Sequence, residues 1–138
     1  MLRKVAIACI ALFILIPFVP HTIAGGWAAV VLNEPLDEVV AGAQTTIEFQ
    51  VLHHGRPEAP LPGMETDFLF LNETTGYFVA VSGEATADPE VYAITFALEQ
   101  AGEWELRAMI RNFNNTPMLT KLPGPIVANV ADPAEGSP

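Results

Sequence analysis

Apolar and polar residues alternate along several stretches of this chain, and this period of two is the feature that most limits how it can fold. Residues 44–52 alternate most clearly, with Ile47, Phe49 and Val51 on one face. The same alternation recurs in residues 91–98 and 103–111. Successive side chains of a β-strand point to opposite faces, so the pattern predicts half-buried strands. No helical periodicity stands out after residue 24, and the chain is therefore predicted to be all-β.

The expected strands are short and are separated by turn residues. They lie at residues 26–32, 44–52, 64–71, 77–82, 91–98, 103–111 and, interrupted by prolines, 118–130, with a short extension at 38–40. Residues 53–63 hold three prolines and two glycines, which predicts a loop that crosses between two sheets. A short turn joins 64–71 to 77–82 and 91–98 to 103–111, so we expect two hairpins.

About seven short strands, each with one apolar face, need a second sheet to cover that face. This favours an immunoglobulin-like antiparallel β-sandwich. A closed barrel is the alternative, but prolines at 57–62 and 123–125 suit open edges better. The expected core side chains are Trp27, Trp104, Phe49, Phe68, Phe70 and Phe96. Met109 falls on the outward face, either as part of a docking patch or as an isolated exposed apolar residue.

Residues 1–24 have the layout of a secretory signal peptide. A basic start at Arg3 and Lys4 precedes an apolar run over residues 5–19, and Ala24 is a suitable small residue before a cleavage site. The alternative is an uncleaved N-terminal anchor that keeps the protein associated with a membrane. In both cases we expect residues 25–131 to form one extracytoplasmic domain, secreted or periplasmic, followed by a flexible tail at 132–138.

Charge and cysteine content exclude several classes of function. Cys9 lies inside the apolar run, so the exported part has no disulfide, thiolate metal site or cysteine nucleophile. After residue 24 the chain has 16 acidic residues against four basic ones, a formal charge of −12. A nucleic-acid partner needs a basic surface and is excluded.

The sequence also gives little support to an enzyme. Ser82 lacks the G-x-S-x-G context of a hydrolase nucleophile. Glu103 and Glu105 share one face of an expected strand, but a solvated strand face needs such residues in any case. We therefore predict a non-enzymatic protein.

His53 and His54 are the only histidines after the leader, and they are adjacent in a loop rich in proline and glycine. Both can bind one ion only if the chain bends there, which Gly55 permits. Copper(I) favours a thioether beside imidazoles, and Met64, Met109 or Met118 can supply it. The candidate ligands are thus His53, His54, Met64 and Met118, with copper as the cofactor. The alternative is a pair of loop histidines that bond to backbone or meet solvent.

Short landmarks along residues 25–112 resemble a known family. They are Gly25-Gly26-Trp27-Ala28, Val40-Ala41-Gly42, His54-Gly55 with Pro57 after it, and Ala101-Gly102-Glu103-Trp104. In this order they resemble YtkA-like domains, relatives of the FixH group. The resemblance implies an immunoglobulin-type sandwich held outside the cell membrane, with a role in copper handling or in the assembly of respiratory oxidases, and with His54 as the family residue. The alternative is a structural or protein-interaction subunit docked on a membrane complex, in which the histidines bind no metal.

Overall fold

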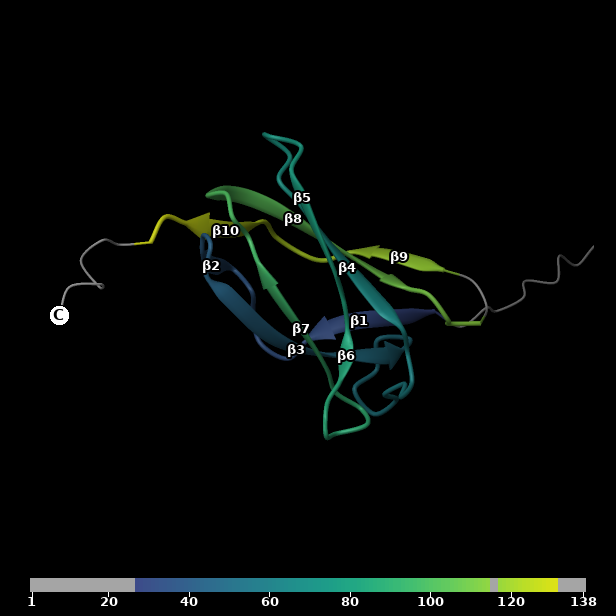
Figure 1. Ribbon diagram of the computed structural model, residues 1–138. Coiled ribbons are helices and arrows are strands. Elements are labelled where there is room, and N and C mark those ends of the chain that lie inside the picture. Colours follow the sequence, from purple (N-terminus) through teal and green to yellow (C-terminus); the bar gives the residue numbers. More distant parts are fainter. Residues whose placement is uncertain (1–26, 115–116, 132–138) are drawn as a thin grey trace, which may run out of the picture.

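The computed structural model describes residues 27–114 and 117–131 of the chain. The secondary-structure elements of this part are all β-strands, and the strands form two sheets (Figure 1). The predicted all-β class is therefore confirmed. The predicted signal peptide at residues 1–24 and the predicted tail at 132–138 lie outside the described residues.

The first sheet has four strands in the order β1, β3, β7, β6. Their bounds are Ala28–Leu32 for β1, Glu84–Ala85 for β6, Tyr92–Ala97 for β7 and Gln44–His53 for β3. All three pairings are antiparallel, and Phe49 of β3 lies opposite Leu32 on one side and Tyr92 on the other. The predicted alternation of residues 44–52 thus places Phe49 and Val51 toward the protein interior, where both are fully buried.

The second sheet has six strands in the order β2, β10, β8, β4, β5, and β9 also pairs with β8. Their bounds are Glu38–Val40 for β2, Thr66–Leu71 for β4, Phe78–Ser82 for β5, Gly102–Ile110 for β8, Met118–Lys121 for β9 and Ile126–Asn129 for β10. β10 pairs with the start of β8 and β9 with its end, while Pro123 and Pro125 lie between them. β2 and β10 run parallel, whereas the other pairs of this sheet are antiparallel.

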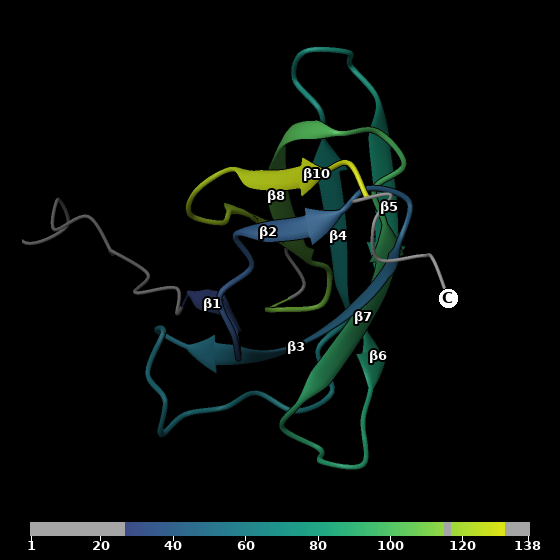
Figure 2. The same ribbon diagram turned by 90° about the vertical axis from the view of Figure 1, so that its left-hand side faces the viewer.

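Aromatic side chains fill the space between the two sheets, which Figure 2 shows as two layers. Phe49 of the first sheet meets Phe68 of the second edge to face, with 4.7 Å between ring centroids. Phe70 stacks on Phe96 across the same space at 4.3 Å. These four rings and Trp104 are buried, as predicted from the sequence. Each large apolar side chain buried here stabilises the fold by roughly 1.5–3 kcal/mol.

The described residues contain ten strands, whereas about seven were expected. Two differences arise because the short segment 38–40 pairs as a strand of its own and because the prolines split the expected last strand into β9 and β10. The third is β6, where Glu84 and Ala85 pair with β7 in a segment whose composition had predicted turns. Two-residue strands leave too short a pattern for alternation to be recognised.

The chain crosses between the sheets at several connections, and one of them had been predicted as a hairpin. β7 pairs with β3 and β6, while β8 pairs with β4, β9 and β10, so the expected hairpin of 91–98 with 103–111 is wrong. A short connection containing glycine suits a hairpin and a crossing equally, and the sequence does not show which strands are the partners. The predicted β4–β5 hairpin and the predicted crossing over residues 53–63 are both confirmed.

Gly83 makes the crossing from β5 to β6. Its amide donates a hydrogen bond to the carbonyl oxygen of Thr66 at 2.7 Å. A Cβ atom at this position would lie 2.7 Å from Cζ of Phe49, closer than carbon atoms approach without displacement. The absence of a side chain therefore lets the crossing strand lie directly on the core.

Candidate functional site

The two histidines lie where β3 ends, in a tight bend of the backbone. His54 and Gly55 both have left-handed backbone angles, with φ of 53° and 65°. The amide of His54 donates to the carbonyl of Trp27 at 2.7 Å, and the amide of Gly55 donates to that of Leu52 at 3.3 Å. The bend that a shared site requires is therefore present. It stacks the His53 and His54 rings with 4.1 Å between centroids and 19° between planes.

Trp27 lies beside this bend instead of in the core, which corrects the prediction made for it. Its side chain is 52% exposed. The inward positions of β1 begin at Ala28, so the residue before it is directed away from the sandwich interior. The indole lies 5.7 Å from the His54 ring, and a Cβ atom at Gly55 would come within 3.1 Å of it. Trp27 thus covers one side of the histidine bend.

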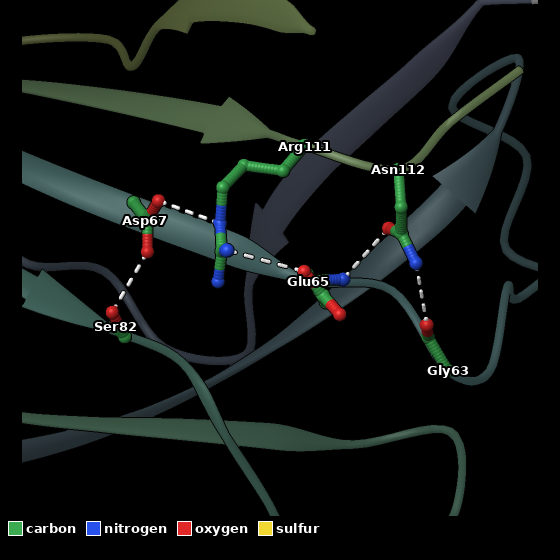
Figure 3. A network of polar contacts seen from close by, with 6 residues as sticks. All are labelled: Gly63, Glu65, Asp67, Ser82, Arg111 and Asn112. Carbon is green, nitrogen blue, oxygen red and sulfur yellow. Dashed lines mark hydrogen bonds and ion pairs between the residues drawn. The ribbon is translucent and has the colours of Figure 1, made fainter. Parts of the chain in front are cut away.

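Asn112 attaches the loop that follows the histidines to the end of β8 (Figure 3). Its Oδ1 accepts a hydrogen bond from the amide of Glu65 at 2.8 Å, and its Nδ2 donates to the carbonyl of Gly63 at 3.0 Å. Met64 lies between these two anchored residues. The next residue after Asn112, Phe113, is buried and lies 6.1 Å from the His53 ring. The Asn112 side chain, next in sequence to the aromatic neighbour of His53, therefore holds the loop segment that carries Met64.

Arg111 continues this network across the second sheet. It forms ion pairs with Glu65 at 3.1 Å and with Asp67 at 2.8 Å, and Ser82 donates to the other oxygen of Asp67 at 2.7 Å (Figure 3). The network joins β5, β4 and the end of β8 to the loop. It fixes the end of the sandwich at which the histidines lie.

Met118 lies close to this end, on the opposite edge of β1 from the histidines. Its Sδ accepts a hydrogen bond from the amide of Ala28 at 3.5 Å. Ala28 is the residue that faces His53 in the pairing of β1 with β3. The described contacts of Met64 do not include the histidines. Its amide donates a hydrogen bond to Oη of Tyr92 at 2.9 Å, and its side chain packs against the core. Met109 lies on the second sheet, opposite Leu119 of β9.

The histidine bend favours uncharged imidazole. Partial desolvation lowers the pKa of His54, and the neighbouring His53 and Arg56 lower it further. Neutral imidazole is the form that binds metal ions.

The donor types at this end suit copper(I), but their present arrangement does not yet form a site. An imidazole nitrogen binds a metal in the plane of its ring, and two nearly parallel stacked rings with centroids 4.1 Å apart are not oriented to share one ion. The Met118 thioether is separated from the rings by the width of β1. Copper binding would therefore need rotation of a histidine side chain. In residues 27–114 and 117–131, no three His, Cys, Asp or Glu side chains are grouped as a metal site.

A second polar cluster was missed by the sequence analysis. Glu105 is on the outward face of β8, as predicted, but it is only 7% exposed. Lys121 of β9 pairs with it at 2.6 Å, and Arg107 pairs with its other oxygen. Hydrogen bonds from Lys121 and then Arg107 lower the pKa of Glu105 to about 2. Alternation along β8 correctly predicts that Glu105 faces outward. The contact with Lys121 depends on the register between β8 and β9, which the sequence does not show.

Comparisons with known proteins give no family for this chain. Neither a scan against models of protein families nor a search of curated proteins finds a match. Among the described residues there is also no helix with the length and apolar character of a membrane span.

Proposed function

We propose that this protein is a non-enzymatic, extracytoplasmic module with an immunoglobulin-like fold that handles copper(I) at its histidine end. The observation that carries the proposal is the gathering of His53, His54 and Met118 beside the first residues of β1. Imidazole and thioether are donors that copper(I) accepts. The resemblance to YtkA-like domains supports the same role and adds assistance in the assembly of a respiratory complex.

The location and the fold type are parts of this proposal. The leader at residues 1–24 supports export, with cleavage or with retention as an anchor. The immunoglobulin-like assignment is supported by the pairing of β1 and β2 in different sheets. β1 pairs antiparallel with β3 in one sheet, and β2 then crosses to pair parallel with the last strand of the other.

Copper(I) would be held by one imidazole of the pair and the thioether of Met118, after a rotation that separates the stacked rings. The lowered pKa of His54 favours binding, since the neutral imidazole is the form that binds a metal ion. Trp27 and Phe113 border the pair on two sides and would limit the access of water. Met64 is held on the neighbouring loop by Asn112 and is a further candidate ligand.

Copper titration tests the proposal. The purified protein carries a Cys9→Ser change, so that a retained leader contributes no thiol, and copper(I) is supplied in competition with a chromophoric chelator. We expect one copper(I) per chain, at least a tenfold loss of affinity in His53→Ala/His54→Ala, and a smaller loss in Met118→Leu. Met109→Leu is the matched control and should bind like the parent. Equal weak binding by the parent and the double variant would end the copper proposal.

A second candidate function is that of an interaction subunit docked on a membrane complex, with no metal role. The exposed apolar side chains of the second sheet favour it, since Leu119 is 65% exposed and Phe78 is 62% exposed. Large exposed apolar side chains on a sheet face are typical of docking surfaces when they are contiguous. The copper titration separates the two candidates, because this one predicts no loss of binding in the histidine variants.

A further inference from the structure

The outer face of the second sheet collects most of the positive charge of the described chain. Three of its four basic side chains are there, each in an ion pair: Lys121 and Arg107 with Glu105, and Arg111 with Glu65 and Asp67. Three positive charges therefore face three negative ones. Elsewhere in the described residues Arg56 is the one basic residue, among 11 further acidic residues of the 14 present. The described chain outside these ion pairs is strongly acidic, and Glu73 and Glu103 bring further negative charge to the Lys121 end of the same face.

Four apolar side chains lie on the same face. Met109 of β8 lies opposite Leu119 of β9, and Leu69 of β4 lies opposite Ala80 of β5. They line a shallow groove together with Asp67, Ser82 and Arg107. We call these four residues the Leu119 face. Because Leu119 is 65% exposed and Ala80 is also exposed, the face meets solvent in a single copy of the chain.

We propose that the Leu119 face is a self-association surface, on which a second copy of this chain docks about a two-fold axis. Two acidic molecules repel each other at most orientations. The repulsion is smallest where both copies present neutral, apolar surface. A two-fold contact also requires a surface that is complementary to itself. Charged residues of both signs lie among the apolar ones here, since Asp67 is opposite Met109 and Arg107 is opposite Leu69, and such a mixed surface can be complementary to a second copy of itself.

The dimensions of the face predict a weak dimer. Four strands spaced about 4.8 Å apart, with about six residues each at about 3.4 Å, cover roughly 400 Å² per copy. Stable complexes bury about 800 Å² per partner. We therefore expect dissociation in the high micromolar range. The inference does not depend on copper at the histidine end.

Sedimentation velocity at protein concentrations from about 10 µM to 1 mM tests the inference. The protein is purified as the cell produces it, with the leader cleaved or retained. The parent should change from monomer to dimer over this range. Leu119→Glu should weaken the dimer at least tenfold, because two added charges would meet across the axis. Val31→Glu is the matched control. Val31 is 41% exposed on the first sheet, and this change should leave the dimer intact.

Salt provides a measurement that needs no variant. Raising sodium chloride from about 20 to 300 mM screens the repulsion between the two acidic copies, so the parent dimer should tighten several-fold. A parent that stays monomeric at 1 mM would overturn the inference. Association that is equal in the parent, Leu119→Glu and Val31→Glu would also overturn it, since a contact made by the leader is common to all three proteins.

Discussion

The outer faces of the two sheets differ far more than their inner faces. Both inner faces consist of buried aromatic and aliphatic residues. The outer face of the first sheet is mostly polar or small, with Val31 as its exposed large apolar residue among those described and a 2.8 Å hydrogen bond between the hydroxyls of Thr46 and Thr95. The outer face of the second carries exposed Leu119 and the buried Glu105 cluster. Folding requires the inner faces to be apolar and leaves the outer faces free to differ, so the difference between them points to function.

Removal of a core ring should have the largest effect, and it should be equal for the two sheets. Phe49→Ala and Phe68→Ala should each lower the free energy of unfolding by about 3–5 kcal/mol, because the two rings pack on each other. Urea unfolding monitored by circular dichroism measures both. A cost below about 1 kcal/mol for either variant would mean that the sheets do not share one core.

The Glu105 cluster should make the second sheet sensitive to acid. The pKa of Glu105 is about 2 in the folded protein, against 4.5 for an ordinary glutamate, so ionised Glu105 stabilises the fold above about pH 4.5. This contribution is lost as the pH falls from about 4.5 toward 2. The difference in unfolding midpoint between the parent and Glu105→Gln should therefore shrink over that range.

Glu48→Gln is the matched control for the acid experiment, since it removes a carboxylate from the outer face of the first sheet. The partner of Glu48 is the Asn33 amide at 3.5 Å, and both side chains are exposed at this contact. At neutral pH this variant should lower the unfolding midpoint less than Glu105→Gln does. A pH-independent difference for Glu105→Gln would show that its ion pairs do not stabilise the fold.

Loss of the threonine hydrogen bond should have the smallest effect. Thr46→Val removes the hydroxyl that contacts Thr95 on the exposed face of the first sheet. The replacement has the same shape and a high preference for strands, so stability should change by no more than about 0.5 kcal/mol. Thermal unfolding measures this. A loss above about 2 kcal/mol would mean that the outer face of the first sheet contributes as much to stability as buried core residues do.

Much of the fold could be predicted from alternation alone. The burial of Phe49, Phe68, Phe70, Phe96 and Trp104 follows from strands with one apolar face. The choice of partner strands could not be predicted, and the failed β7–β8 hairpin is the example. A short connection constrains where the next strand begins but not the edge on which it pairs, because that edge is decided by competition among all strands.

A bend at the candidate site could be anticipated from the sequence, but the arrangement of its side chains could not. Gly55 permits a bend after His53 and His54, and the backbone has one. The stacking of the rings and the position of Met118 across β1 depend on the register between strands far apart in sequence. Trp27 was misplaced because its size favours burial, whereas its place before the first inward residue of β1 decides its exposure.

The parallel pair of β2 and β10 joins the beginning of the folded part to its end. Contacts between distant segments form slowly, because a long loop has to close first. Until β10 has been synthesised, or has emerged from a membrane channel, this edge of the sheet stays open. We therefore expect the pairing of β2 with β10 to form late in folding, so that an exported chain, as we propose this one to be, keeps this sheet edge unpaired during most of its passage.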